Sequence, residues 1–136
     1  MVDRRTEEGM TGNTLQITPF MHVADLDSAV RFFVGTLGFA VPLQHANYAY
    51  VEREGAGIRI LANDRPEELG VPHRGFAYYI DVLDLDQVVR ELGPNLAGLP
   101  AGEVIGPIDQ AYGQRELLVR APDGNLIVFG QSIPQE

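Results

Sequence analysis

The stretch VADLDSAVR at residues 23–31 recurs 59 residues later as VLDLDQVVR at residues 82–90, with six of the nine positions identical. The shift is close to half of the chain that follows residue 14. A match at that spacing predicts two copies of one supersecondary unit, residues 15–66 and 74–133. We expect both copies to form a single domain, preceded by a polar tail at residues 1–14.

Both copies follow the same order of predicted elements. An aspartate, Asp25 or Asp84, follows an apolar stretch and stands where a helix N-cap belongs. Gly38 is placed to end the first helix. The order in each copy is therefore β-α-β-β-β, an α+β fold, with a linker at residues 64–75. The predicted elements are strand 15–23, helix 27–37 and strands 39–44, 48–54 and 57–63 in the first copy, and strand 76–82, helix 86–93 and strands 103–108, 115–120 and 125–131 in the second.

The composition restricts the partners and the chemistry. The 136 residues include 19 acidic and 10 basic side chains, for a net charge of −9. A field of this sign repels the phosphates of nucleic acids and attracts cationic ligands. The absence of cysteine excludes disulfides, thiolate metal sites and cysteine nucleophiles. No signal peptide or membrane-spanning run is visible, so we expect a cytoplasmic protein without a membrane partner.

Two longer motifs connect the repeat to a known family. The first runs from VADLD at residues 23–27 through FF at 32–33 to LGF at 37–39. The second is YGQREL at 112–117, followed by APDGNL at 121–126 and Phe129. On these motifs the chain resembles the vicinal oxygen chelate superfamily, which includes glyoxalase I, extradiol dioxygenases and bleomycin-resistance proteins. Ala121 departs from the usual aspartate before the proline. The resemblance implies two curved half-sheets that close around a ligand cup, in many members between the chains of a homodimer.

The resemblance also implies where a metal would lie. The enzymes of the superfamily chelate a divalent ion inside the cup, through His, Glu or Gln side chains. Carried over by motif, those positions fall on Thr18, Ala77 and Val128. Threonine, alanine and valine cannot hold a catalytic divalent ion. We therefore predict that the usual metal site is absent and that no cofactor is needed.

The predicted cup is aromatic at its base and polar at its edge. Side chains alternate along a strand, so Phe20 and His22 share the face of Thr18. His22 and Asp81 are equivalent in the two copies, and a hydrogen bond between them is one expectation. The resemblance aligns Tyr48 and Tyr112 with aromatic residues of bleomycin-resistance proteins, although both rings could instead pack against their own sheet or a dimer partner. The predicted ligand-binding residues are Phe20, His22, Tyr48, Tyr50, Tyr79, Asp81, Tyr112, Glu116 and Val128.

Two functions fit this sequence. The first is a metal-free binding protein, as a homodimer, that sequesters an organic molecule such as a cationic aromatic antibiotic and thereby gives antibiotic resistance. The alternative is a metal-dependent lyase, isomerase or dioxygenase with a non-standard site built from His22, Asp81 and Glu116. A fold retained for binding a partner protein is a third possibility. Stoichiometric metal in the purified protein would favour the enzyme.

Overall fold

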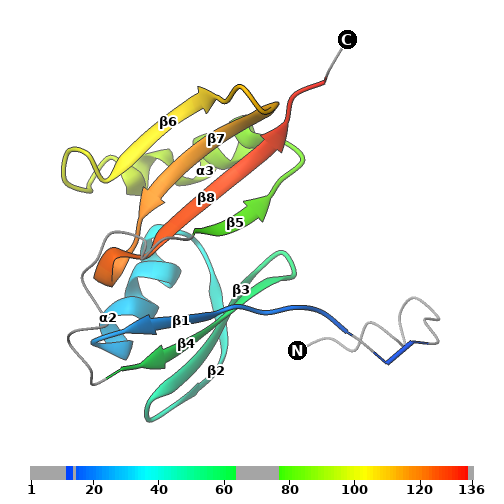
Figure 1. The fold of residues 1–136 in the computed structure, drawn as a ribbon. Coiled ribbons are helices and arrows are strands. Elements are labelled where there is room, and N and C mark those ends of the chain that lie inside the picture. The colour runs from blue at the N-terminus through cyan, green and yellow to red at the C-terminus, as the bar shows by residue number, and fades with distance from the viewer. Residues whose placement is uncertain (1–11, 14, 64–76, 135–136) are drawn as a thin grey trace.

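The chain folds into two similar modules, each a four-stranded mixed sheet with a helix against one face (Figure 1). The computed structural model describes residues 12–13, 15–63 and 77–134. The strand order is β1-β4-β3-β2 in the first sheet and β5-β8-β7-β6 in the second. In each sheet the pair formed by the first and last strands is parallel and the other pairs are antiparallel. The predicted α+β fold is confirmed, and the linker predicted at 64–75 lies outside the described residues.

The order of elements is the same in the two modules. The first module contains β1 (Phe20–Val23), α2 (Leu26–Arg31), the π-helical turn η1 (Phe32–Thr36), β2 (Ala40–His45), β3 (Tyr48–Arg53) and β4 (Ala56–Ala62). The second contains β5 (Tyr78–Asp81), α3 (Leu85–Leu96), β6 (Val104–Asp109), β7 (Gln114–Arg120), the short turn η4 (Pro122–Gly124) and β8 (Leu126–Ser132). Neither α2 nor α3 is long and apolar enough to cross a membrane, and the same holds for every helix in the described ranges.

The first strand is shorter than predicted. The expected range was 15–23, but β1 begins only at Phe20. Pro19, the residue before it, has no backbone N–H to donate to the ladder, although its carbonyl still accepts from the Arg59 N–H at 3.0 Å. Residues 15–19 therefore continue past the sheet without joining it as a strand.

The first helix is also divided where the sequence predicts one element over residues 27–37. Helix α2 ends at Arg31 and continues as the π-helical turn, in which the Leu37 N–H bonds to the Phe32 carbonyl at 3.2 Å. Such a wider turn lets the chain take in an extra residue while Phe33 and Leu37 both stay buried. Gly38 ends the segment as predicted, with a φ of 74° that glycine adopts without strain.

The second helix is longer than predicted. We expected it to end at residue 93, but α3 continues to Leu96 and contains Pro94. Leu92 and Leu96 are both buried, in line with Leu85 earlier in the helix. Burial of this apolar stripe outweighs the one hydrogen bond that the proline removes.

Both predicted N-caps are confirmed. The Asp25 carboxylate accepts from the Ser28 N–H at 3.2 Å, and the Asp84 carboxylate accepts from the Gln87 N–H at 3.3 Å. Each bond satisfies one backbone donor in the first helical turn. The two aspartates therefore begin the two helices at equivalent positions of the repeat.

The Asp25 cap gives a prediction about acid stability. The hydrogen bond from the Ser28 backbone lowers the pKa of Asp25 below its ordinary value of 3.8. Because the pKa is lower in the folded chain, the charged cap stabilises the fold above the ordinary value of 3.8, and this stabilisation is lost as the pH falls through the lower pKa of the folded chain. Asp25→Asn keeps an oxygen acceptor but cannot titrate. We expect this variant to lose less stability than the parent between about pH 5 and about pH 3 in urea unfolding; equal losses would contradict the prediction.

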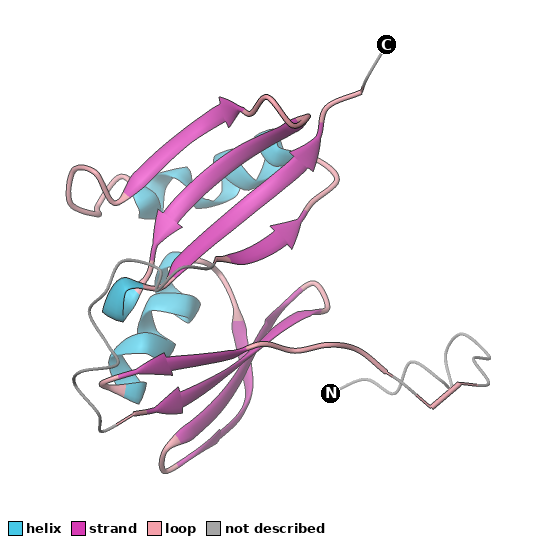
Figure 2. Cartoon of the chain, viewed as in Figure 1, coloured by secondary structure: helices cyan, strands magenta, loops and turns pink. Residues whose placement is uncertain are grey.

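Alternation along the strands gives each sheet one face that packs on a helix and one open face (Figure 2). Met21 and Val23 are fully buried in one cluster with Phe33 of the helical layer, whereas Phe20, the residue before Met21, is 51% exposed on the other side. We call the helix-free side of the first sheet the first open face and that of the second sheet the second open face. The first carries Phe20, His22, Tyr48, Tyr50 and Arg59; the second carries Tyr79, Asp81, Glu116, Val128 and Gly130.

Polar contacts hold the two modules together. The Tyr78 hydroxyl donates to the Phe20 carbonyl at 2.9 Å, and the Asn125 side-chain amide donates to the His22 carbonyl at 3.1 Å. An ion pair also joins Arg53 to Glu91 of α3. These contacts fix the first strand of one module against the second module.

Candidate functional site

A single arginine organises the first open face. Arg59 lies on β4, and its Nε donates to the Thr18 hydroxyl at 2.8 Å. Its Nη1 donates to the Tyr48 hydroxyl at 2.6 Å, and its guanidinium carbon lies 5.5 Å from the centre of the Tyr50 ring. Thr18, just before β1, and two tyrosines of β3 are therefore gathered around one cation.

A buried carboxylate organises the second open face. Glu116 of β7 is only 3% exposed. One of its oxygens accepts from the Gln110 side-chain amide at 3.1 Å, and the other accepts from the Tyr112 hydroxyl at 2.9 Å. A carboxylate this deeply buried needs such donors, since an unpaired one would be strongly disfavoured. The network fixes the end of the Tyr112 ring, which is 67% exposed.

Tyr79 lies beside this network. Its hydroxyl donates to the Gln114 side-chain carbonyl at 3.1 Å, and its ring lies across Gly130, where an added Cβ would be 2.0 Å from the hydroxyl oxygen. Only a glycine leaves room for the ring at this place in the sheet. The ring remains 41% exposed, so it presents a fixed aromatic surface.

The environment keeps both phenols protonated. Burial, together with the nearby negative charge of Glu116, raises the pKa of Tyr79 far above its ordinary value. The hydrogen bond to Glu116 likewise raises the pKa of Tyr112. Both hydroxyls are therefore protonated at neutral pH and act as hydrogen-bond donors.

The predicted site residues divide between the two faces. Tyr50 is 4% exposed beneath Arg59, whereas Phe20 is half exposed at the edge of the same face. Val128 is also 4% exposed and forms part of the floor beside Tyr79, its partner in the β5–β8 register. Phe20, His22, Tyr48 and Tyr50 lie on the first face; Tyr79, Asp81, Glu116 and Val128 lie on the second, with Tyr112 in the turn before β7.

The expected hydrogen bond between His22 and Asp81 is wrong. The His22 ring nitrogen Nδ1 lies 3.4 Å from the Asn63 side-chain amide, and Asp81 is not among its partners in the described ranges. His22 and Asp81 occupy equivalent positions, but His22 lies in the first sheet and Asp81 in the second. Equivalent positions in two different sheets need not be in contact.

The residues at the inferred metal positions do not fit a divalent ion. Thr18 binds the guanidinium of Arg59, which brings a fixed positive charge to that position. Val128 is a buried aliphatic side chain, and Ala77 has no donor atom. The alternative trio of His22, Asp81 and Glu116 is not assembled either: in the described part of the chain, no three His, Asp or Glu side chains gather in a way that could hold a metal.

Sequence reasoning missed three residues of these faces. Arg59 is not among the predicted residues, although a lone cation between two buried isoleucines in a strand is an available signal for a functional position. Gln110 lies in the turn between β6 and β7, and its side chain donates to Glu116. The alternation of residues along a strand does not predict a contact made from a turn. Gln16 was assigned to a strand, and its side chain instead donates to the Tyr50 hydroxyl at 3.3 Å.

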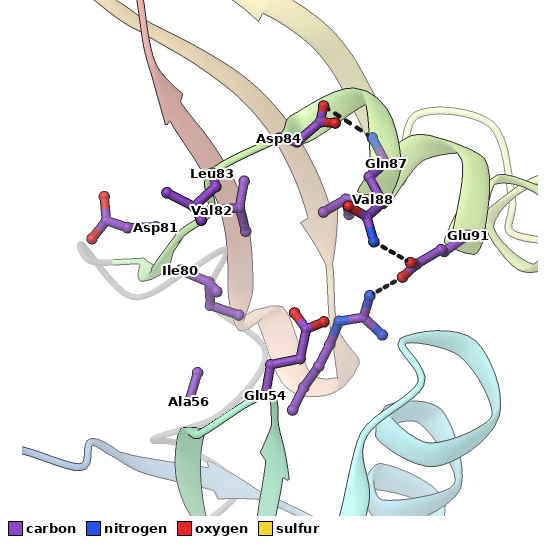
Figure 3. Close-up of a pocket in the computed structure, with 11 residues that line it drawn as sticks. Glu54, Ala56, Ile80, Asp81, Val82, Leu83, Asp84, Gln87, Val88 and Glu91 are labelled. Atoms are coloured by element: carbon purple, nitrogen blue, oxygen red, sulfur yellow. Dashed lines mark hydrogen bonds and ion pairs between the residues drawn. The ribbon is translucent and has the colours of Figure 1, made fainter. Parts of the chain in front are cut away.

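Two grooves lie where the modules meet. One, of about 350 Å³, runs between residues 16–19 and β5, with Tyr79 among the residues that line it. The other, of about 390 Å³, lies between the β3–β4 turn and the start of α3. Arg53 and Glu91, which form an ion pair, both line this second groove, and Figure 3 shows that the Asp81 carboxylate points away from Glu91. The first groove is therefore the one that adjoins the aromatic residues of the candidate site.

Comparison with known proteins identifies the family. The sequence profile of the Glyoxalase/Bleomycin resistance protein/Dioxygenase superfamily matches residues 16–129. The chain belongs to this superfamily, as the motifs predicted. A search of the curated proteins gives no significant match.

Solved structures of antibiotic-binding and antibiotic-resistance proteins share the fold. The bleomycin-binding protein from bleomycin-producing Streptomyces verticillus, complexed with copper(II)-bleomycin, has a TM-score of 0.72 and 22% identity, covering 92% of this chain and 100% of that one. The bleomycin resistance determinant encoded on the transposon Tn5 has a TM-score of 0.67 and 21% identity over 88% and 98% of the two chains. TnmS3, an antibiotic-binding protein from Streptomyces sp. CB03234, has a TM-score of 0.63 and 23% identity over 89% and 99%.

Proposed function

We propose that this chain is a binding protein for an organic small molecule with aromatic groups, and that it holds the ligand on its open faces without a metal ion and without catalysing a reaction. The observation that carries this proposal is the pair of exposed rings, Tyr79 and Tyr112, fixed beside the buried Glu116. Rings held in one position offer a stacking surface at little cost in conformational freedom. Each such contact contributes ~0.5–1.5 kcal/mol beyond burial.

The proposed ligand is an antibiotic-like compound that includes a cationic group. The net charge of −9 favours the capture of cations, and a cation over a tyrosine ring adds ~0.5–2 kcal/mol. Two of the similar structures are a bleomycin-binding protein and a bleomycin resistance determinant, and a third binds an antibiotic. These likenesses support sequestration of a drug as the biological role.

A calorimetric titration with metal-free bleomycin tests this proposal. The protein is first dialysed against EDTA, and in a separate titration the ligand-free protein is mixed with zinc, nickel, iron or manganese. We expect saturable binding of metal-free bleomycin after EDTA treatment and no stoichiometric binding of an ion by the ligand-free protein. Stoichiometric binding of an ion by the ligand-free protein would contradict the metal-free site, and the absence of bleomycin binding would contradict a bleomycin-type ligand.

A further inference from the structure

Arg59 occupies a special position in the duplicated fold. In the first sheet it is the register partner of Phe20, and in the second sheet the register partner of Tyr79 is Val128. Phe20 and Tyr79 are 59 residues apart, the spacing of the repeat, so Arg59 is the first module's equivalent of Val128. Both modules therefore place an uncharged aromatic residue of the first strand beside this position, but only the first module places a cation there.

The partners of the Arg59 guanidinium are all neutral. They are the hydroxyls of Thr18 and Tyr48 and the ring of Tyr50. A guanidinium has five N–H donors, and these two hydrogen bonds use two of them. Glu52 shares the face of Tyr48 and Tyr50 by alternation, yet no ion pair between described residues involves Arg59.

The missing counter-charge matters because Arg59 is half-buried. Arg53, Arg115 and Arg120 each face a carboxylate, whereas Arg31 and Arg90, which have no described ion pair, are exposed to solvent. A half-buried cation without an anion loses hydration that neutral partners restore only in part. The chain has 19 acidic residues, but none of those in the described ranges forms an ion pair with Arg59.

The orientation of the Arg59 guanidinium indicates which chemical group of a ligand would pair with it. The bonds to Thr18 and Tyr48 hold the guanidinium in one orientation, and the Tyr50 ring lies against it. A planar, oriented guanidinium matches the two oxygens of a carboxylate, which it binds through two parallel hydrogen bonds. Because Thr18 stands at one of the metal positions that the family resemblance implies, the arginine supplies positive charge where an enzyme relative would have an ion.

We propose that Arg59 binds a carboxylate of the ligand, so that the natural ligand is an aromatic compound that bears this group. The inference rests on the proposed function, since it assumes that the open faces bind an organic ligand. The inference restricts the ligand to molecules that carry both a carboxylate and a cationic group. The carboxylate would pair with Arg59, and the cationic group would be attracted by the net negative charge of the protein. Thr18 and Tyr48 act as positioning residues that orient the guanidinium.

A matched pair of probes tests this inference. Para-biphenylcarboxylate and para-biphenylcarboxamide have the same rings and nearly the same shape, and only the first carries a charge. We expect the parent protein to bind the carboxylate about tenfold or more tightly than the amide in calorimetry, because hydrogen bonds to charged groups are the stronger ones. Arg59→Met is expected to abolish this difference by weakening the carboxylate while leaving the amide within about twofold.

Two further variants complete the experiment. Arg90→Met removes an exposed arginine of α3 and should leave the preference for the carboxylate unchanged. Arg59→Lys keeps the charge but loses the planar fork, so it should retain only part of the preference. This variant also keeps the test decisive if Arg59→Met does not fold, which circular dichroism would reveal.

The outcomes separate the inference from the proposed function. Equal binding of the two probes by the parent protein, or a preference that survives in both Arg59 variants, would overturn the carboxylate site while leaving an aromatic binding protein in place. Failure of both probes to bind would also overturn the inference. The bleomycin titration described above then decides separately whether the proposed function stands.

Discussion

Phe33→Ala is expected to lower the free energy of unfolding by about 3–5 kcal/mol. The Phe33 ring is fully buried and makes edge-to-face contacts with Phe32 and Phe39, with ring centres 5.8 Å and 5.1 Å away. Its removal takes away buried apolar surface and leaves a cavity that the surrounding helix and sheet can fill only in part. Urea unfolding followed by circular dichroism measures the change.

The neighbouring Val34 provides the control for this variant. It lies in the same π-helical turn but is 44% exposed, so Val34→Ala should change the stability by no more than about 0.5 kcal/mol. Equal effects of the two substitutions would mean that the turn itself, rather than the burial of Phe33, determines the stability of the first module.

Gly130→Ala is expected to weaken bleomycin binding by about 1–3 kcal/mol, to the same extent as Tyr79→Ala. The added methyl group would lie 2.0 Å from the Tyr79 hydroxyl and 2.3 Å from the adjoining ring carbon, so the ring must leave its place. The ring is partly exposed and is held at its end by Gln114, which makes movement easier than a rearrangement of the sheet. Calorimetry on both variants measures the loss.

Gly93→Ala is the matched control for this substitution. Gly93 lies within α3, and nothing lies within 4 Å of the position where its Cβ would be built. The change should leave ligand binding unaltered and stabilise the helix by up to about 1 kcal/mol. Unchanged binding by Gly130→Ala would show that the position of the Tyr79 ring does not matter for the ligand.

The duplicated fold follows from the sequence because its signals are local. Asp25 and Asp84 begin the two helices. They are 59 residues apart, which is the shift that aligns the two modules. Gly38 ends the first helical segment for an equally local reason, its positive φ. Two boundaries differ from the prediction for other reasons. Strand β1 begins late because Pro19 has no backbone N–H to donate to the sheet. Helix α3 continues beyond Pro94 because Leu92 and Leu96 are buried.

The candidate site was predictable only in part. Strand alternation places Tyr79, Asp81, Glu116 and Val128 on one face, as expected from their spacing. The contacts within the faces depend on long side chains that meet across strands and turns. Arg59 reaches Thr18, and Tyr112 reaches Glu116 from a turn. Repeat equivalence suggested a bond between His22 and Asp81, but it relates positions in two sheets and does not bring them together.

A crystal structure of the EDTA-treated protein with metal-free bleomycin, together with anomalous data from ligand-free crystals soaked in nickel or zinc, tests the central claim most directly. The account predicts ligand density against the rings of Tyr79 and Tyr112, and no anomalous peak bound to the protein in the ligand-free crystals. An ion bound to the protein beside Thr18 and Arg59, or a ligand seated away from both open faces, would contradict it.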